Sequence, residues 1–164
     1  MEITTFKDMY LAELQELVSV EQQLGEALLR MAKVASHPSL RAALERHQRE
    51  TIMQEERLRS ILEKHEAAAE QHTDQAMQAL IRETEKMCVI LKDGYLRDAG
   101  LIASAQKLEH YEIAAYGSVA ALAGQLNLRE DQRLLHNALD EEKRADELLT
   151  TLAKGEINQD ALAA

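Results

Sequence analysis

Apolar side chains recur along much of this chain at alternating steps of three and four residues, the spacing that places them on one face of an α-helix. Four long segments carry such an apolar stripe, and a shorter helical segment lies between the second and the third. No run of alternating β-branched residues predicts a strand. The chain is therefore predicted to be all-α, with long helices over residues 5–34, 38–67, 98–125 and 127–154 and a short helix over residues 74–91.

Capping residues and a proline predict the ends of the first two helices. Thr4 or Thr5 can accept a hydrogen bond from the first turn of the first helix. The segment "ASHPSL" interrupts the pattern, and Pro38 suits the first turn of the second helix, with Ser36 or His37 as its cap. The short turn between these helices predicts an antiparallel hairpin.

Similar signals mark the later helices. Thr73 can cap the short helix, and Asp98 can cap the third long helix. Asn127 and Glu130 have the spacing of a capping box at the start of the fourth, and Gly155 is expected to end it. The last two long helices should therefore form a second hairpin.

The middle connection is long and contains a helix of its own, so it can cross the full length of the bundle. This connectivity is that of a ferritin-like four-helix bundle with a short helix in the crossover between helices 2 and 3, and it differs from an up-down-up-down arrangement. We expect a single domain over residues 1–157 and a short C-terminal tail over residues 158–164.

Acidic or imidazole side chains interrupt every apolar stripe close to the middle of its helix. Antiparallel helices of similar length place their midpoints at one level, so these side chains should converge in the centre of the bundle. Taken singly, each has an ordinary interpretation as a partly exposed flank residue or a core histidine, but their common depth on four helices favours a joint site. The candidates are Glu21, His47, Glu50, Glu109, Glu112, Glu142 and Asp146.

Such a group of buried carboxylates needs a neutralising partner. An unpaired buried charge costs several kcal/mol, and like charges raise one another's pKa. Few lysines or arginines lie on the same stripes, and Lys107, Lys143 and Arg144 fall beside them. A single divalent or trivalent cation could neutralise several of these carboxylates at once. A ligand set rich in oxygen, with at most one or two imidazoles, favours iron or manganese over a structural zinc site.

Composition and charge narrow the function further. The formal net charge of −10 argues against a nucleic-acid partner, because phosphate binding needs a basic face. Cys88 is the single cysteine, so no intramolecular disulfide forms, which fits a reducing compartment. No apolar run approaches the roughly 20 residues that span a membrane. We therefore expect a cytoplasmic protein without nucleic-acid or membrane partners.

Four stretches resemble the YciE/YciF family of ferritin-like bacterial stress proteins: "SVEQQL", "HQRETIMQ", "DAGLIASAQKLEHYEIAAYG" and "LDEEKRADELL". The resemblance extends over residues 5–154, and "AQKLEHYEIAAYG" is its most specific part. It implies a four-helix ferritin-like fold, a dinuclear metal centre and a homodimer. It does not imply a settled activity.

The wider ferritin-like pattern takes one Glu from each of two helices and Glu-x-x-His from the other two. By position, Glu21 matches the Glu of the first helix, Glu50 that of the second, Glu112 or Glu109 that of the third and Glu142 that of the fourth.

The chain departs from this pattern at the histidines. Met53 stands three residues after Glu50, and Ala145 stands three residues after Glu142. Instead, His47 precedes Glu50 by three residues.

Two functions remain open at this level. The first is a dinuclear iron or manganese protein that handles peroxide, dioxygen or Fe(II), with Glu112 and Glu50 as candidate bridges and Tyr116 able to hydrogen-bond a ligand or donate an electron. The second is a non-enzymatic, dimeric helical bundle with a structural or remnant metal site. Iron storage in a large cage is a weaker third interpretation, since no subunit contacts for a cage can be identified.

Overall fold

The computed structural model describes residues 3–69 and 72–164, so residues 1–2 of the predicted domain and 70–71 of the predicted middle connection lie outside it. Throughout the described ranges, all regular structure is helical, as predicted. The elements are α1 (Phe6–Val34), α2 (Pro38–Lys64), α3 (Gln75–Ile90), α4 (Gly94–Gln125), α5 (Arg129–Leu152), a π-helical turn η1 (Ala153–Ile157) and α6 (Asn158–Ala163).

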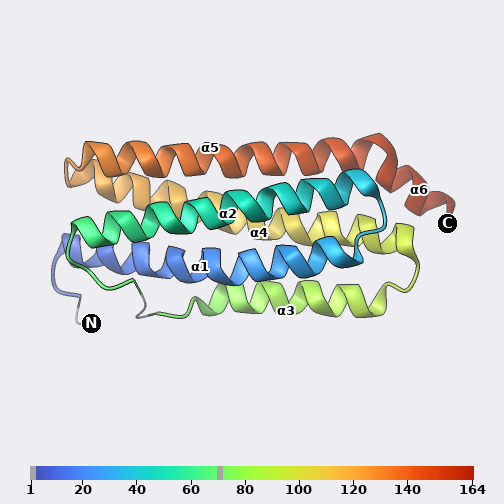
Figure 1. Ribbon diagram of the computed structural model, residues 1–164, viewed down its shortest axis with the longest axis horizontal. Coiled ribbons are helices and arrows are strands. Elements are labelled where there is room, and N and C mark those ends of the chain that lie inside the picture. The colour runs from blue at the N-terminus through green and yellow to red at the C-terminus, as the bar shows by residue number, and fades with distance from the viewer. Residues whose placement is uncertain (1–2, 70–71) are drawn as a thin grey trace.

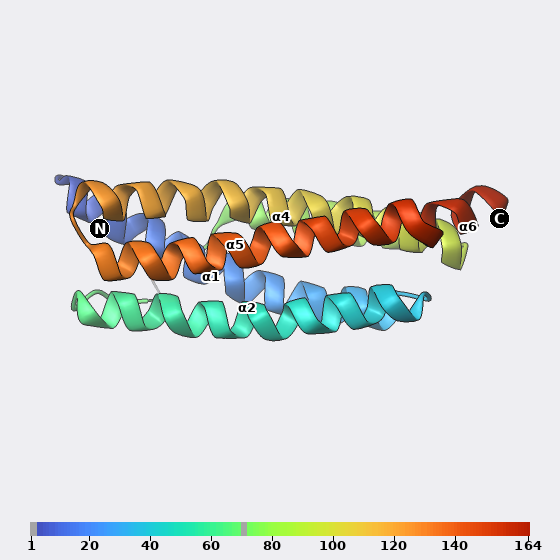
Figure 2. The same ribbon diagram turned by 90° about the horizontal axis from the view of Figure 1, so that it is seen from above.

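The four long helices lie side by side as two antiparallel hairpins, α1 with α2 and α4 with α5 (Figure 1). Figure 2 shows α4 and α5 lying above α2, with α1 crossing obliquely from the level of α4 at its N-terminal end to that of α2 at its other end. Helix α3 runs along the bundle and packs against α1 and α4 (Figure 1). It carries the chain back to the far end before α4 begins. The predicted ferritin-like bundle with a helix in the crossover is therefore confirmed.

Two apolar clusters fill the bundle, one on each side of its midpoint. One cluster contains Leu24, Leu28, Leu44 and Ile102, and the other contains Leu14 and Leu58, among other residues. Helices α1, α2 and α4 bury their apolar stripes, as Leu17, Leu40 and Val119 illustrate. Packing of these stripes stabilises the helices, and the interruptions in them define the level between the two clusters where polar side chains gather. No helix within the described ranges is long and apolar enough to cross a membrane.

The hairpin of α1 and α2 begins as its caps predict. The Thr5 hydroxyl accepts a hydrogen bond from the Asp8 N–H (3.1 Å), and the Asp8 carboxylate accepts one from the Thr5 N–H (2.8 Å), which completes a capping box. Pro38 opens α2 after His37. The helix ends at Lys64, earlier than residue 67, because Glu66 adopts a positive φ of 56°.

Asp98 does not cap its own helix, but binds the turn that precedes α2. Helix α4 begins at Gly94 with Asp93 as its cap, so Asp98 lies inside the first turns and is buried. Its carboxylate accepts hydrogen bonds from the N–H groups of Ser36 (2.8 Å) and His37 (2.7 Å), just before α2. The prediction that Asp98 caps its own helix is wrong, because tertiary packing directs this carboxylate to the start of another helix.

The predicted capping box of α5 is also wrong. Asn127 has a positive φ of 58°, and the N–H of Leu128 bonds to the carbonyl of Ala123 (3.0 Å). This geometry ends α4. Leu128 then precedes α5 without a side-chain hydrogen bond, so Glu130 has no reciprocal partner in a box.

Gly155 does not end the fourth long helix. The chain continues through the π-helical turn into α6, and the side chain of Ile157 is 1% exposed in the cluster with Leu24. Burial of Ile157 explains why the helical path continues. The short crossover helix is capped by Asp74, whose carboxylate accepts from the Met77 N–H (2.6 Å), and the prediction of Thr73 as its cap was one residue early.

Candidate metal centre

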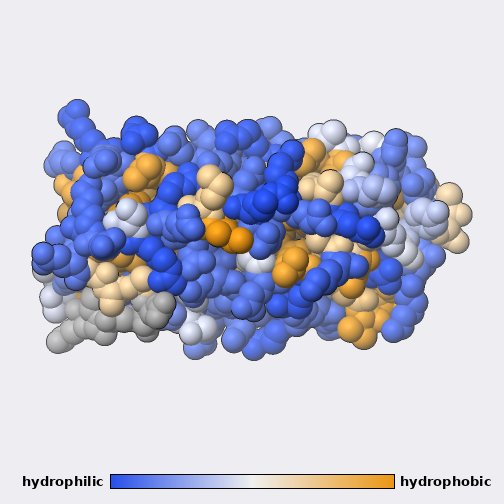
Figure 3. Space-filling view, viewed as in Figure 1, coloured by the Kyte–Doolittle hydropathy of each residue, from blue (hydrophilic) through white to orange (hydrophobic). Residues whose placement is uncertain are grey.

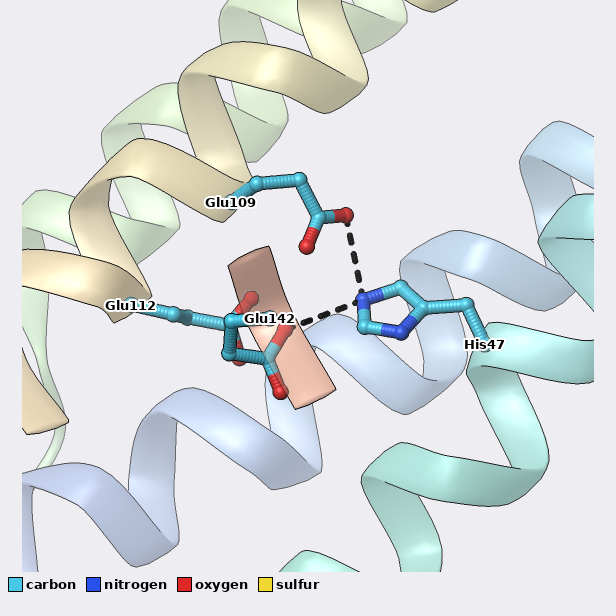
Figure 4. A group of neighbouring side chains, drawn as sticks. All are labelled: His47, Glu109, Glu112 and Glu142. Atoms are coloured by element: carbon cyan, nitrogen blue, oxygen red, sulfur yellow. Dashed lines mark ion pairs between the residues drawn. The ribbon is translucent and has the colours of Figure 1, made fainter. Parts of the chain in front are cut away.

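Four metal-ligating side chains meet at the midpoint of the bundle (Figure 4). His47 comes from α2, Glu109 and Glu112 from successive turns of α4, and Glu142 from α5. One ligand atom of each lies within 4.8 Å of those of the others. We call these four residues the His/Glu cluster. All are buried, because each occupies the apolar stripe of its helix.

The imidazole of His47 connects the acidic groups. Its Nε2 atom lies 3.0 Å from Oε1 of Glu109 and 3.5 Å from Oε2 of Glu142, and both contacts are drawn in Figure 4. Its Nδ1 atom faces the other way, toward Oε2 of Glu50 at 3.7 Å. One nitrogen of His47 therefore faces into the cluster, and the other faces Glu50 at its margin.

Several oxygens of the cluster lack any hydrogen-bond partner. Both oxygens of Glu112 are unpartnered, as are Oε2 of Glu109 and Oε2 of Glu142. A buried carboxylate without a donor loses its hydration and gains no hydrogen bond that would replace it. Oxygens that converge in this state are the donors that iron and manganese prefer, and His47 adds one imidazole. The residues of the cluster could therefore hold a metal ion.

Burial and mutual repulsion change the proton affinities of the cluster. Desolvation raises the pKa of Glu112 well above its usual range, and the charges of Glu142, Glu21 and Glu109 raise it further. Desolvation also raises the pKa of Glu142, which His47 opposes. For His47, desolvation lowers the pKa, but the neighbouring carboxylates outweigh it and hold the pKa well above normal. The metal-free cluster thus holds protons that a cation would displace.

Glu21 lies beside the cluster on α1. Its side chain is 1% exposed, and its Oε1 accepts a short hydrogen bond from the hydroxyl of Tyr116. Its Oε2 has no partner. Desolvation raises the pKa of Glu21 to about 8, although the bond from Tyr116 and the charge of His47 act against the shift. Glu21 is thus a further acidic donor at the level where the bundle is most polar.

The remaining two predicted ligands lie at the margin. Glu50 is 39% exposed and contacts only the outward nitrogen of His47 within the predicted ligand set. Asp146 is 20% exposed and accepts a hydrogen bond from the amide of Gln106 (3.0 Å), with His110 Nε2 at 3.4 Å. Of the seven predicted side chains, the structure therefore brings four together, places Glu21 next to them and leaves these two outside.

Gln54 is the residue that sequence reasoning missed. Its buried amide donates a short hydrogen bond to Oε1 of Glu142 and a second one to Oε2 of Glu141 (3.1 Å). The Arg57 guanidinium also binds Glu141, so the chain of contacts extends to the surface. The available signal was a polar residue on the same stripe as His47, two turns further along α2.

Comparison with known proteins places the chain in a family. The model of a family described as a domain of unknown function (DUF892) matches residues 5–162. The chain belongs to this family. Protein YciF of Escherichia coli strain K12 is similar to it, with 38% identity over 162 residues, which cover 98% of each chain. The predicted resemblance to YciE/YciF proteins is confirmed.

Solved structures agree with this assignment. The crystal structure of the stress protein YciF of E. coli is similar to this DUF892 chain with a TM-score of 0.90 and 38% identity, covering 95% of this chain and 99% of the other. YcfI of Rhodopseudomonas palustris, described as a structural protein, gives a TM-score of 0.88 and 35% identity over 92% and 96%. A protein of Xanthomonas campestris pv. campestris shares the fold, with a TM-score of 0.80, 19% identity and 97% coverage of both chains.

Proposed function

We propose that this protein is a ferritin-like, stress-associated protein that binds two iron or manganese ions and handles peroxide, dioxygen or Fe(II). The observation that carries the proposal is the His/Glu cluster: one imidazole and three carboxylates from three helices, all buried, with four oxygens that have no hydrogen-bond partner. The similarity of the whole chain to the stress protein YciF supports the association with stress.

The arrangement of acids supports a site for two ions. Glu109 from α4 contacts His47 from α2 at 3.0 Å, and Glu21 contributes an unpartnered Oε2 from α1. Glu112 and Glu142 would help to hold the ions, because both are buried in the cluster with oxygens that have no hydrogen-bond partner. Glu50, a candidate bridge by sequence, lies outside His47 and is not assigned this role.

Bound iron or manganese would supply redox chemistry and Lewis acidity. The protein's own groups have separate tasks. Glu112 and Glu142 hold protons in the metal-free state and release them when they become ligands. Tyr116 donates a hydrogen bond from its hydroxyl to Glu21 and fixes that side chain. The apolar clusters on both sides keep bulk water away, which strengthens electrostatic interactions inside the site.

Metal titration tests this proposal. Anaerobic calorimetry with Mn(II) and Fe(II), together with elemental analysis, should give two ions per chain for the wild type. Glu112→Gln should lose at least one ion and the consumption of peroxide or Fe(II). Glu56→Gln is the matched control, because Glu56 is exposed on α2. Absence of binding at micromolar metal, or equal binding by Glu112→Gln, would contradict the proposal.

A non-enzymatic bundle with a structural or remnant metal site is the second candidate. Hydrogen bonds in and beside the cluster favour this second candidate. Tyr116 donates one to Glu21, and Gln54 donates one to Glu142, so one oxygen of each acid is satisfied without an ion. Metal binding with a melting shift but no turnover of peroxide or Fe(II) would support this second function over the first.

We further propose that the protein is a cytoplasmic homodimer. Several large apolar side chains are exposed away from the core, and Figure 3 shows apolar residues among polar ones on one face of the molecule. Burial between two copies would remove them from water. They include Ile52 at 44%, Ile90 at 57% and Val89 at 64% exposure. The free Cys88 is compatible with a reducing compartment. Light scattering at micromolar concentration should give twice the monomer mass, and a monomer mass would remove the dimer.

A further inference from the structure

A small cavity adjoins the His/Glu cluster between α2 and α5. Its volume is about 20 Å³, which is room for one water-sized molecule. Alanine and leucine side chains form its walls, with Ala43 on α2 and Ala145 and Leu148 on α5. The short side chains of Ala43 and Ala145 leave the space, and any larger residue at either position would fill it.

The inner end of the cavity is made by residues of the cluster. His47 and Glu109 both line it. His47 is 5% exposed and its ring nitrogens contact only carboxylates, and Oε2 of Glu109 has no hydrogen-bond partner. A molecule in the cavity would therefore touch two groups that are expected to hold metal.

The outer end of the cavity carries a guanidinium group, which donates hydrogen bonds, and a carboxylate, which accepts them. Arg46, which is exposed, and Glu50, which is half-buried, are the lining residues nearest to solvent. The charges of Arg46 and Arg144 both act on the Glu50 carboxylate. Two guanidinium groups beside one carboxylate do not favour a cation. A hydrated divalent ion is also larger than the cavity.

The opposite side of α2 has a different character. The depression between α1 and α2 is lined by Glu21, Glu26 and Glu55, with no lysine or arginine among the described residues that form it. Arg30 pairs with Glu26 and Arg59 pairs with Glu55, so these acids are neutralised by residues beside the depression. Glu21 is buried at its floor.

We propose that the cavity between α2 and α5 is the port through which hydrogen peroxide reaches the metal centre. Peroxide is close to water in cross-section, carries no charge, and can both accept from Arg46 and donate to Glu50. Ala43 and Ala145 set the size limit, so bulky organic hydroperoxides are excluded. This inference rests on the proposed function, in which the cluster binds metal.

Filling the cavity tests the port by two measurements. Ala145→Leu should leave the Mn(II) affinity unchanged, and should lower the water-proton relaxivity of the Mn(II)-loaded protein at least twofold, because water reaches the ion by the same path. Peroxide consumption should fall about tenfold. Ala42→Leu is the matched control, the same substitution at an exposed position of α2, and should change neither quantity.

Enlarging the cavity should act in the opposite direction. Wild-type protein should consume hydrogen peroxide but not cumene hydroperoxide, and Leu148→Ala should consume both and raise the relaxivity. This variant also decides the matter if Ala145→Leu does not fold. Unchanged relaxivity and peroxide rate in a folded, Mn(II)-loaded Ala145→Leu would overturn the port alone. Failure of the wild type to bind Mn(II) would overturn the proposed function and the port together.

Discussion

Two buried acids in this bundle have opposite surroundings. Asp131, in the first turn of α5, is 1% exposed and accepts contacts from three side chains: Tyr10 (3.2 Å), His65 (2.7 Å) and Lys64 (3.0 Å). Glu112, at the midpoint of α4, is 0% exposed, and neither of its oxygens has a partner. Burial is equal, but hydrogen bonding is not.

The proton affinities follow the same contrast. Desolvation acts to raise the pKa of Asp131, but the hydrogen bonds from His65 and Lys64 outweigh it and lower the pKa below its usual value. Nothing offsets desolvation at Glu112, whose pKa is raised. A buried acid that joins three helices, as Asp131 does, stabilises the fold. A buried acid with free oxygens, as Glu112 has, opposes folding until a cation arrives.

The largest expected effect is at the paired acid. Asp131→Asn removes the charge that Lys64 and His65 contact, and should lower the free energy of unfolding by about 3 kcal/mol, because it breaks a buried charged network. Urea denaturation of the metal-free protein measures the change. Glu130→Gln is the control, since Glu130 also contacts Lys64 but is exposed, and little change is expected. If Asp131→Asn were as stable as Glu130→Gln, the proposed stabilising role of Asp131 would be contradicted.

The unpaired acid should respond in the opposite direction. Glu112→Gln removes a carboxyl that must take up a proton to be buried, so the metal-free protein should be as stable as the wild type or more stable. Metal bound only to the native state adds roughly 2.7 kcal/mol at a hundredfold excess over Kd, and Glu112→Gln should reduce this gain. Thermal melts with and without Mn(II) measure both effects. A variant that changes neither melt would show that Glu112 takes no part in a metal site.

The pH dependence should separate the two regions. The pKa of Glu21 is about 8 in the folded state and roughly 4.3 in an unfolded chain. The native state therefore binds more protons between these values, and the stability of the metal-free protein should fall as pH rises from 5 to 8, by at most about 1.4 kcal/mol per pH unit for this group. Glu21→Gln should reduce the slope.

Asp131 supplies the contrasting titration. Its folded pKa is lowered, so its contribution to stability is complete above the unfolded pKa of about 3.9 and is lost as pH falls through the folded value. Asp131→Asn should remove this loss at acidic pH and leave the slope between pH 5 and 8 unchanged. Denaturation at a series of pH values checks both. A steeper slope of the unfolding free energy between pH 5 and 8 in Asp131→Asn would contradict the contrast between Asp131 and Glu21.

The smallest effects are expected at the margin of the cluster. Asp146→Asn and Glu50→Gln change acids that lie on the predicted stripes or at their edge but outside the cluster. Their Mn(II)-induced melting shifts should stay close to that of the wild type, whereas Glu112→Gln loses most of its shift. A loss at Asp146 as large as that at Glu112 would place it among the ligands.

Much of the candidate site was visible in the sequence because helical periodicity is a local property. The stripe of α4 places Glu109 and Glu112 on the buried face whatever the rest of the chain does, and both are at most 1% exposed. The midpoint argument brought them to the level of His47 and Glu142. Gln54 was on the same kind of stripe, but an amide carries no charge to draw attention to it.

The sequence alone determined the helical class, the two hairpins, the crossover helix and the depth at which acids collect, since each follows from the spacing of apolar residues and from chain length between breaks. Only the tertiary structure decided which groups each acid meets. It sent Asp98 to the start of α2 and left Asp146 beside Gln106, outside the cluster. It also placed three donors around Asp131 and none around Glu112. The physical reason is that a hydrogen bond depends on atoms brought together from distant parts of the chain, to within a fraction of an ångström, and periodicity along one helix does not specify that distance.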